Sequence, residues 1–371
     1  MTLDQDLQQW VRLSLVNGLG PRGLVGLLRA LGEPAFILSA TEKTLAELVS
    51  PSIATAICQM AERNLDAEFA QLANWLAQPN CQLLTLADAA YPKRLLDLPD
   101  PPPLLYAQGD LSLLTRPAVS VVGSRNATAQ GIANAEQFAA FLAQQSVCVI
   151  SGMASGIDAA AHRGGLSGVG SSIAVVGTGL DRVYPAANRA LAHHLAAQGL
   201  LLSELALGSP PKAEHFPRRN RLIAALGAGC LVVEAALESG SLITARQAAD
   251  LGREVFAIPG SIHSPVAKGC HRLIKQGAKL VEAGADILEE LAGNLALDLS
   301  PQKTPSAGLE TPSEESPLLG LMGWDAVEFD WLVLQSGLTS EALCAILLGL
   351  ELEGKVASLP GNRYQRLGIA K

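Results

Sequence analysis

The chain has 371 residues, of which 49% are hydrophobic and only 17% are charged. Such a composition provides a sizeable core and excludes an intrinsically disordered protein, and the length predicts two or three domains. No apolar run of about 18 residues is free of charges and turn residues, so no membrane span is expected. The acidic amino-terminal residues lack the basic segment and apolar stretch of a signal peptide, so we expect a cytoplasmic protein.

The six cysteines lie far apart in the sequence, and no two of them form a CxxC pair. This spacing fits neither a disulfide framework nor a zinc site, so we expect no bound metal. The cysteines are Cys58, Cys81, Cys148, Cys230, Cys270 and Cys344.

The net charge of −8, from 27 basic and 35 acidic residues, taken alone argues against a nucleic-acid-binding protein. The acidic excess lies in the flanks, because residues 1–115 hold 7 basic and 12 acidic side chains and residues 293–371 hold 5 and 10. Residues 116–292 hold 15 basic and 13 acidic side chains, a net charge of +2. The composition therefore leaves room for an anion-binding site in the middle of the chain.

Two breaks in composition divide the chain. Residues 98–105 contain four prolines, which no helix interior tolerates. Residues 300–317 are rich in Pro, Ser, Thr and Glu and nearly without apolar side chains, which is typical of a flexible linker. We therefore predict an amino-terminal domain over 1–98, a second domain over 99–292, a linker over 293–317 and a carboxyl-terminal domain over 318–371.

The first part is predicted to be helical, with stretches at 6–16, 17–32 and 44–49 and a long one from about 52 to 77. The second part alternates helical patterns with continuous apolar runs, most of which end in Gly, Ser or Glu. These strand candidates are 118–123, 147–151, 172–177, 200–204, 230–235 and 255–260. The alternation predicts an α/β fold, a doubly wound, mostly parallel sheet with helices on both faces. Such sheets bind ligands outside the carboxyl ends of their strands.

The loop after the first of these strands, VVGSRNATAQG, suits a phosphate. Gly123 and Ser124 would offer backbone N–H groups at a helix start, and Arg125 adds a planar cation. The loop is not a GxGxxG motif, and no acidic residue follows at ribose-binding distance. The alternative interpretation is a plain strand-to-helix turn with a surface arginine.

The next two loops carry weaker signals. SGMASGIDAAAH places Gly152 before a helix on which Asp158 and His162 are four residues apart. We favour a capping, salt-bridged pair over a catalytic acid–base pair there. GTGLDRVYP has Arg182 where the final glycine of a dinucleotide fingerprint belongs, so it gives little support for NAD.

The strongest local signal is FPRRNR, residues 216–221. It gathers three arginines and Asn220 in a chain that carries few charges, and a solvated loop is the alternative interpretation. Further along, Gly240 and Ser241 begin a helix whose amino terminus suits an anion. No GxSxG, HExxH or metal-spaced His/Cys set occurs, so the loops indicate a surface for a polyanion with several phosphates.

Six motifs in one order resemble the DNA-processing protein A family (DprA, also called Smf). They are VVGSRNAT, SGMASGIDAAAH, GTGLDRVYP, FPRRNRLIA, VVEAALESGSLITARQA and VFAIPGSI followed by KGCHRLIKQGA. The resemblance covers about residues 90–290. It implies an extended Rossmann-like domain that binds single-stranded DNA, forms a homodimer and delivers incoming DNA to the RecA recombinase during natural transformation.

The resemblance also implies which residues contact DNA. Family positions carry over to the loop of Gly123, Ser124 and Arg125 and to the segment of Phe216, Arg218, Asn220 and Arg221. Ser155 and Ala186 replace basic residues that are frequent in the family, and Arg163 and Arg189 lie close enough in sequence to compensate. The predicted DNA site consists of eleven residues: Gly123, Ser124, Arg125, Gly152, Arg163, Phe216, Arg218, Asn220, Arg221, Gly240 and Ser241.

The ends of the chain fit the same family. NGLGPRGLVGLL (17–28) resembles a helix-hairpin-helix or sterile-alpha-motif-like (SAM-like) element, and a helical interaction module is an equal alternative. Residues 324–367 resemble the winged helix of the family. Because this segment is acidic, we favour partner binding or regulation over DNA reading.

The leading hypothesis is a non-enzymatic, cofactor-free recombination mediator that protects single-stranded DNA and loads RecA. The alternative is a nucleotide-processing hydrolase on the same scaffold, with Glu234 near a helix start. That alternative is disfavoured because the chain lacks a PGGxGT-like loop, and an NAD dehydrogenase is disfavoured by the missing fingerprint.

Overall fold

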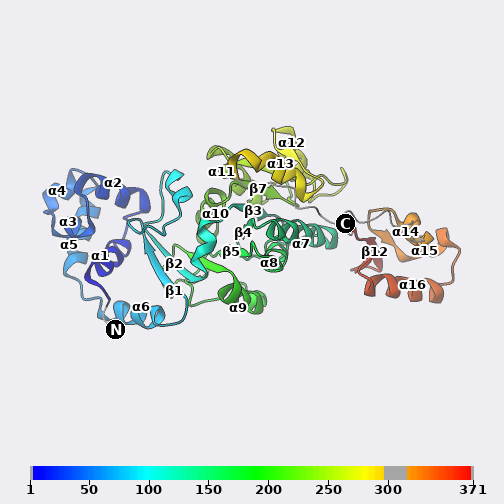
Figure 1. Ribbon diagram of the computed structural model, residues 1–371, viewed down its shortest axis with the longest axis horizontal. Helices are drawn as coiled ribbons and strands as arrows, with labels where there is room; N and C mark the ends of the chain where they lie inside the picture. The colour runs from blue at the N-terminus through cyan, green and yellow to red at the C-terminus, as the bar shows by residue number, and fades with distance from the viewer. Residues whose placement is uncertain (1–2, 296–315, 369–371) are drawn as a thin grey trace.

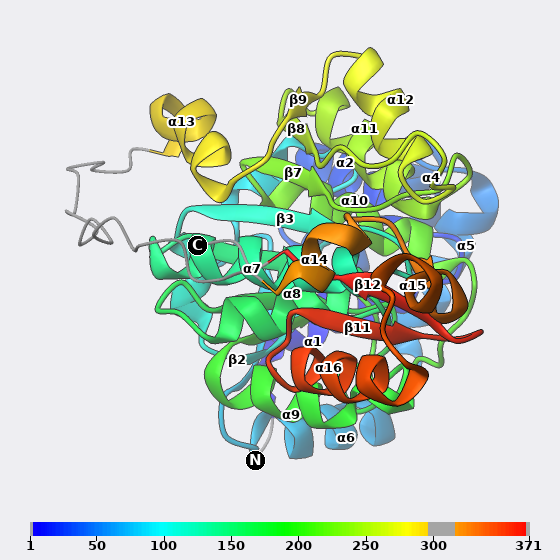
Figure 2. The same ribbon diagram turned by 90° about the vertical axis from the view of Figure 1, so that its right-hand side faces the viewer.

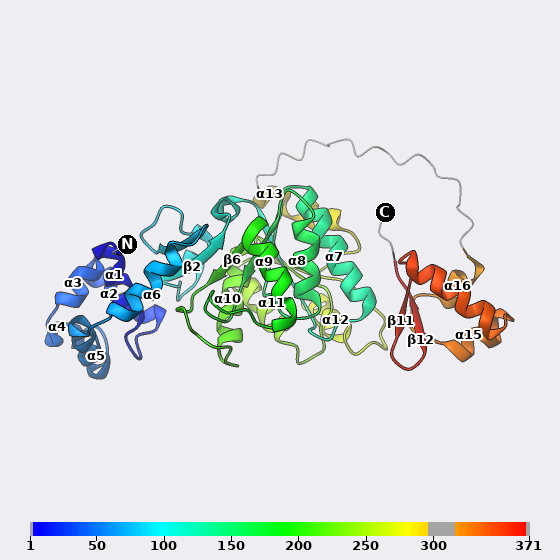
Figure 3. The same cartoon turned by 90° about the horizontal axis from the view of Figure 1, so that it is seen from below.

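The computed structural model describes residues 3–295 and 316–368. Three parts follow one another along its long axis: amino-terminal helices, a large sheet with helices on both faces, and a small carboxyl-terminal domain (Figure 1 and Figure 3). The linker predicted over 293–317 lies mostly outside the described residues. In the part of the chain that the structure describes, no single helix is long and apolar enough to cross a membrane. Only α15 (Phe329–Ser336) and α16 (Ser340–Leu352) together, bent by 111°, reach that length.

The amino-terminal part consists of six helices: α1 (Gln5–Ser14), α2 (Pro21–Leu31), α3 (Pro34–Ser39), α4 (Glu42–Ala46), α5 (Pro51–Glu62) and α6 (Asp66–Leu76). Three of these helices have proline at their first position, where its missing N–H is no loss. The single long helix predicted over 52–77 is wrong. Asn64 Oδ1 accepts a 2.8 Å hydrogen bond from Asp66 N, which starts a new helix.

One sheet of nine strands forms the centre, in the order β1-β2-β6-β5-β4-β3-β7-β8-β9. The strands are β1 (Cys81–Thr85), β2 (Leu104–Gly109), β3 (Ala118–Val122), β4 (Cys148–Ser151), β5 (Ser172–Val175), β6 (Leu200–Ser203), β7 (Gly229–Val232), β8 (Glu254–Ala257) and β9 (Lys279–Leu280). All six predicted strands are confirmed, as β3 to β8. They pair in parallel with one another, and β9 continues the parallel pairing at the far edge.

The sequence missed β1 and β2, which add an antiparallel edge to the sheet next to β6. Residues 81–97 were assigned to the helical domain because the proline run drew the boundary at 98. The prolines instead lie in the connection between β1 and β2, where Tyr91 Oη donates a 2.8 Å hydrogen bond to Pro102 O. The helical part therefore ends at α6.

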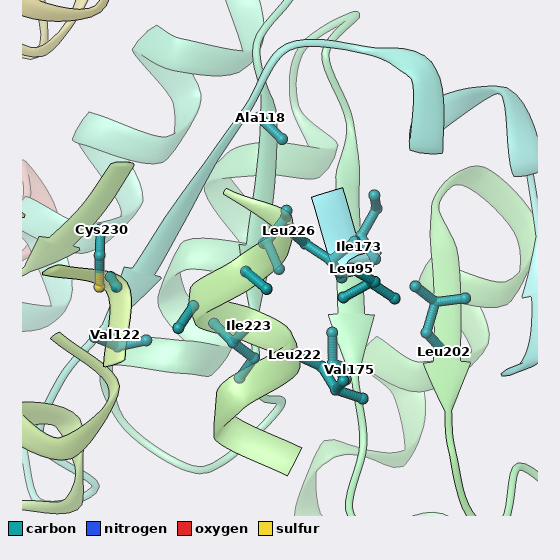
Figure 4. Close-up of a cluster of buried hydrophobic side chains, with 14 of the residues drawn as sticks. Leu95, Ala118, Val122, Ile173, Val175, Leu202, Leu222, Ile223, Leu226 and Cys230 are labelled. Carbon is teal, nitrogen blue, oxygen red and sulfur yellow. The ribbon is translucent and has the colours of Figure 1, made fainter. Parts of the chain in front are cut away.

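Alternating side chains of the strands bury both faces of the sheet. On one face, Ala118, Ile173 and Val175 pack against α10 (His215–Leu226), as Figure 4 shows, and α11 (Gly240–Asp250) and α12 (Lys268–Lys275) extend that layer. On the other face, residues such as Val119 and Val149 pack against further helices. Those helices are α7 (Ala129–Gln144), α8 (Ile157–Leu166) and α13 (Gly284–Leu295), with α9 (Arg189–Gln198) and α6 beside them over the β5, β6 and β2 end. The predicted doubly wound architecture is confirmed.

The order of the strands defines where a ligand would bind. From β3 the chain moves outward through β4, β5 and β6, and then returns to place β7 on the other side of β3. The connections after β3 and β7 therefore leave the sheet in opposite directions. In an open α/β sheet, the crevice at such a switch point is the usual binding site.

The carboxyl-terminal domain contains α14 (Pro317–Met322), β10 (Val327–Glu328), α15 (Phe329–Ser336), α16 (Ser340–Leu352), β11 (Val356–Leu359) and β12 (Arg363–Arg366). Three helices on a three-stranded antiparallel sheet form the expected winged helix, with its own apolar core. It contacts α7 through Gly368, whose N–H donates to Gln130 Oε1 at 2.9 Å. Figure 2 looks along the long axis onto this domain, which lies in front of the sheet and its helices. Residues 329–352, which include both α15 and α16, contain no Lys or Arg.

Candidate nucleic-acid interface

A pocket of about 510 Å³ opens at the carboxyl ends of β3 and β7, at the switch point. We call it the strand-end pocket. Six of the eleven residues predicted to contact DNA line it: Gly123, Ser124, Arg125, Asn220, Gly240 and Ser241. The loops after β3 and β7, the middle of α10 and the first turn of α11 thus meet at one place, as the strand-end rule predicts.

Close packing fixes the loop after β3. Ser124 N donates to Glu234 O at 2.8 Å, and Ile157 N donates to Ser124 O at 3.1 Å, so the loop is tied to β7 and to α8. A Cβ on Gly123 would lie 2.6 Å from the side chain of Ile157, so only glycine allows α8 to pack this closely. The loop is a rigid part of the sheet edge. The expectation that Ser124 N–H is offered to a ligand is wrong, because it donates to Glu234 O, and Asn126 N likewise donates to Ser124 Oγ at 3.2 Å.

Arg125 presents an unpaired charge at the rim. Its side chain is exposed, and no carboxylate in residues 3–295 or 316–368 forms an ion pair with it. The guanidinium lies over the ring of Phe216 at 5.5 Å, and Phe216 packs in turn against Tyr184 with ring centroids 5.6 Å apart. An exposed cation held by an aromatic ring is suited to a phosphate, because it loses little freedom when it binds.

The first turn of α11 faces the same pocket. Ser239 is its N-cap and accepts a 3.3 Å hydrogen bond from Ser241 N, while Gly240 is open, since a Cβ at this position would meet no atom within 4 Å. The helix dipole and the first-turn N–H groups favour an anion here. Glu238 and Asp158 also line the pocket, so the anion site is not uniformly positive.

Arg219 lies beneath the pocket and is only 4% exposed. Its Nη1 donates to the carbonyl oxygens of Gly152, at 2.5 Å, and of Val175, and its Nε donates to Asn220 Oδ1 at 3.1 Å. Burial lowers the pKa of Arg219 to about 10, with Asp158 opposing the shift. This guanidinium connects the ends of β4 and β5 to α10 and forms the floor of the site.

The buried Asp158 is the counter-charge of Arg219. Burial raises the pKa of this carboxyl group, while Arg219 and hydrogen bonds from Ala154 N, Gly152 N and Ser151 oppose the rise. The carboxylate therefore closes the loop after β4 onto the start of α8. The pair neutralises charge under the pocket and leaves Arg125 as its exposed cation.

Arg221 and Arg218 belong to a second network, away from the pocket. Arg221 Nη2 lies 2.5 Å from Glu204 Oε2, Arg221 Nη1 donates to Asp100 O at 2.8 Å, and Arg218 Nε lies 3.1 Å from Glu204 Oε1. The side chains of Arg221 and Glu204 are 9% and 3% exposed. Arg221, predicted to contact DNA, is thus not an exposed cation, because two carboxylates from distant segments, Glu204 and Asp100, enclose it.

Comparison with known proteins decides the family. The family model of DNA recombination-mediator protein A matches residues 82–292, more than half of the chain, and that of the DprA winged helix domain matches residues 301–362. This chain belongs to the DprA/Smf family. It is 37% identical to Protein Smf of Escherichia coli K12 over 98% of this chain and 96% of that protein. It is 48% identical to the DNA processing protein DprA of Streptococcus pneumoniae over 56% of this chain and 73% of that protein.

Two solved DprA structures are similar to this fold. The protein from S. pneumoniae superposes with a TM-score of 0.66 at 36% identity, covering 78% of this chain and 99% of that one. The protein from Helicobacter pylori superposes with a TM-score of 0.53 at 30% identity, covering 58% of this chain and 97% of that one. The latter structure is described as giving insight into a unique single-stranded DNA binding mode.

Five residues predicted for the DprA site do not line the strand-end pocket. Phe216 lies at its rim beside Arg125, and Gly152 is buried below it against Arg219. Arg218 and Arg221 contact Glu204, as described. Arg163 lies towards the far end of α8, where its Nε pairs with Glu136 Oε2 at 3.2 Å on α7, so it does not compensate within this site for Ser155 or Ala186.

One further expectation is corrected. Asp158 and His162 do not form a pair, because His162 Nδ1 lies 2.7 Å from Ser172 Oγ on β5 while Asp158 closes the preceding loop. Burial lowers the pKa of His162 to about 3. Glu234, the residue of the hydrolase alternative, accepts hydrogen bonds from Thr128 N at 2.9 Å and Thr128 Oγ1 at 2.5 Å and thereby fixes the start of α7.

Sequence reasoning missed the role of Arg219. FPRRNR was predicted as a cluster of DNA-contacting charges, and no helix was assigned to it. In the structure α10 begins at His215, so successive side chains point about 100° apart. Arg218 and Arg221, three residues apart, share one face and reach Glu204, while Arg219 points to the sheet. The apolar stretch that follows, LIAAL, was the signal that the segment is helical.

The described residues contain no group of three or more His, Cys, Asp or Glu side chains arranged to hold a metal ion. All six cysteines are free, and four of them are buried. Burial raises the pKa of Cys148, Cys230 and Cys270 to about 12, so these thiols stay protonated.

Proposed function

We propose that this protein binds single-stranded DNA at the strand-end pocket and acts as a recombination mediator rather than as an enzyme. The observation that carries the proposal is the position of Arg125. It is an exposed cation without a carboxylate partner in the described residues, it lies at the switch point of the sheet, and it faces the first turn of α11. A guanidinium on a rigid loop and a helix amino terminus together suit phosphate oxygens.

Single strands suit this edge better than duplex DNA. Tyr184 is 46% exposed and packs beside Phe216, so the rim of the pocket offers an aromatic surface next to the phosphate site. Unpaired bases stack on such surfaces without regard to sequence, whereas the bases of a duplex are already stacked on one another. We therefore expect weak sequence preference and affinity that depends mainly on phosphates.

The hydrolase alternative has little support in the site. Glu234 would have to act as a base or nucleophile, but both of its oxygens accept hydrogen bonds from Thr128 at the start of α7. Burial raises the pKa of Glu234, and the two hydrogen bonds oppose that rise. A structural role in holding the DNA-binding loop accounts for this carboxylate.

The finer parts of the proposal follow the DprA/Smf family. We propose a cytoplasmic homodimer that protects incoming single strands and loads RecA on them during natural transformation. The acidic winged helix, without Lys or Arg in residues 329–352, supports a partner-binding or regulatory role for that domain over DNA reading.

The test is a binding assay on the full chain with oligo-dT and duplex DNA as the salt concentration is raised. Binding through phosphates predicts a log–log slope of about −0.7 for each phosphate neutralised on a single strand. Salt-independent binding or sequence-specific duplex binding would contradict the proposal. Turnover of nucleoside monophosphates would favour the hydrolase. Light scattering and a RecA strand-exchange assay on coated DNA test the dimer and the loading of RecA.

A further inference from the structure

A second hollow, of about 590 Å³, lies at the amino ends of the central strands, and we call it the amino-edge pocket. Two short 3₁₀ helices, η1 (Lys93–Asp97) and η2 (Leu111–Thr115), contribute to its walls. Ala118 at the start of β3 lines this pocket, whereas Val122 at the end of β3 lines the strand-end pocket. The four steps between these residues span about 13 Å of extended strand, so the two pockets are separate sites.

Three cationic side chains line the amino-edge pocket: Lys93, Arg94 and Arg116. In the part of the chain that the structure describes, none of them forms an ion pair. Arg116 Nη1 donates to the carbonyl oxygen of Val169, and no acidic residue is among the described residues that line the pocket. In a chain with a net charge of −8, three uncompensated positive charges around one hollow indicate an anionic ligand.

Arg94 is the cation that most clearly lacks a partner. Its Nη1 atom is buried and has no hydrogen-bond acceptor among residues 3–295 and 316–368. Asp97, three residues later in η1, forms an ion pair with Nη2 of Arg253. Burial and the charge of Arg253 lower the pKa of Arg94, and Asp97 opposes that shift. A guanidinium without an acceptor costs free energy on burial, and an anion in the amino-edge pocket would supply the acceptor.

Much of the remaining lining is apolar. Leu113 on η2 and Leu226 at the end of α10 form part of the wall. The floor reaches Ile150 and Ile173 on the strands, and Figure 4 shows Ile173 and Leu226 in the same buried cluster as Ala118. Pockets of about 300–1,000 Å³ hold small organic ligands. An inorganic ion alone would leave this apolar lining uncovered, so the ligand should carry an apolar or aromatic group as well as its charge.

From these observations we infer that the amino-edge pocket binds a nucleoside di- or triphosphate, with Lys93, Arg94 and Arg116 on the phosphates and the apolar floor against the base. A single terminal phosphate carries a charge of about −2 at neutral pH, so three cations suit a ligand with more than one phosphate. The inference goes beyond the proposed function and does not depend on it, because the pocket lies at the other edge of the sheet.

The experiment is titration calorimetry of the full chain with ATP and ADP, and with inorganic pyrophosphate and adenosine as the two parts of the ligand. The test variant is Lys93→Ala with Arg94→Ala. The matched control is Lys43→Ala with Arg29→Ala, which removes one lysine and one arginine from exposed positions outside the pocket. A second variant, Thr115→Glu, adds a carboxylate at an exposed position of the wall and removes no cation. Melting temperatures are measured on all preparations.

We expect ATP and ADP to bind the parent chain, pyrophosphate to bind more weakly, and adenosine to give no measurable binding. The test variant should bind ATP about tenfold more weakly or worse, because two charge-assisted contacts are lost. Thr115→Glu should weaken ATP to a similar degree, since its carboxylate pairs with the cations and repels phosphates. The control should stay within about twofold of the parent chain, and ATP should raise its melting temperature and that of the parent chain.

Competition with DNA shows which pocket the nucleotide occupies. Saturating oligo-dT should leave the affinity for ATP within about twofold, because the strand-end pocket is a separate site. Displacement of ATP by oligo-dT would place the nucleotide in the strand-end pocket and overturn the inference.

Four further results would overturn it. In the first, neither ATP nor ADP binds the parent chain. In the second, the test variant and Thr115→Glu both fold and keep the parent affinity. In the third, the control loses as much affinity as the test variant. In the fourth, pyrophosphate binds as tightly as ATP, so the base contributes nothing. None of these results touches the proposed function, which is tested by the salt dependence of oligo-dT binding.

Discussion

Replacing Arg221 with alanine should destabilise the fold and leave the DNA affinity of the folded molecules unchanged. The guanidinium is surrounded by protein groups: Glu204 Oε2 at 2.5 Å, Asp100 O at 2.8 Å and Asp100 Oδ1 at 3.4 Å. The Arg221 and Glu204 side chains are 9% and 3% exposed, so water cannot replace the lost partner. These protein groups account for the position of Arg221, so no contact with bound DNA is needed to explain it.

The size of the effect follows from the burial of the pair. Removing one partner of a buried ion pair leaves an uncompensated charge and costs about 3–5 kcal/mol, because the remaining ion can neither be hydrated nor neutralised cheaply. Domain stabilities are about 5–15 kcal/mol, so the loss should be a clear fall in melting temperature. Replacing both residues with apolar ones of similar volume, Glu204→Leu with Arg221→Met, should recover part of the loss.

Arg125→Ala should have the opposite profile. An exposed arginine over an aromatic ring contributes little to folding, so the melting temperature should barely change. Loss of one charge-assisted phosphate contact, worth about 1.5–3 kcal/mol, should weaken binding to oligo-dT about tenfold or more. Arg125→Lys should recover only part of it, because an ammonium lacks the planar fork.

Both variants are tested on the same preparations, by denaturant unfolding and by binding to oligo-dT at a temperature where each remains folded. Wild-type stability with weakened binding in Arg221→Ala would refute the structural role of that residue. Unchanged affinity in Arg125→Ala would remove the strand-end pocket as the DNA site, whatever the family membership implies.

The remaining predictions concern the interior and the carboxyl-terminal domain. Because burial lowers the pKa of His162 from 6.5 to about 3, the unfolded chain takes up a proton first as the pH falls, and stability is lost in that range. His162→Asn should reduce this loss by about 1.4 kcal/mol per pH unit, measured by denaturant unfolding at pH 7 and pH 5; equal pH dependence would contradict the assignment. Deleting residues 318–371 should leave affinity for oligo-dT within a few-fold, and a collapse of binding by the folded remainder would make the winged helix a DNA reader.

The parallel part of the fold could be predicted from sequence because its strands are buried on both faces. β3 to β7 have buried residues along nearly their whole length, and continuous apolar runs between helical patterns are typical of a parallel sheet covered on both sides. β9 was not predicted because it has only two residues, both exposed, and therefore no apolar pattern. β1 and β2 were not predicted because the proline run between them resembles a linker and suggested a domain boundary there.

The location of the candidate site could be predicted from the sequence, but the side chains that form it could not. The strand-end rule brought the loops of Gly123 and Gly240 to one crevice. Which arginine of α10 faces solvent depends on helix phase and on partners far away in the sequence. Glu204 comes from the end of β6 and Asp100 from the loop before β2, and nothing in FPRRNR shows that they would enclose Arg221. Sequence patterns predict where the backbone lies well, but they predict the partners of individual side chains poorly.

The packing of the buried Arg219 can be tested by replacing Gly152, the glycine that lies against it. A Cβ on Gly152 would lie 2.5 Å from Nη2 of Arg219 and 2.6 Å from its Cζ, closer than real Cβ atoms approach. The guanidinium cannot retreat freely, since it donates to Gly152 O and Val175 O inside the protein. Gly152→Ala should therefore destabilise the domain by about 1–3 kcal/mol, the usual cost of overpacking.

The matched control is Gly240→Ala, at a position where a Cβ meets nothing within 4 Å, and it should leave stability unchanged. Since the clash of Gly152→Ala is with one side chain, the effects of Gly152→Ala and Arg219→Ala should not add. The double variant should be no less stable than Arg219→Ala alone, as a double-mutant cycle of melting curves would show. Additive losses would mean that Gly152 is required for its backbone rather than for the space that Arg219 occupies, and the floor of the strand-end pocket would then depend on the loop itself.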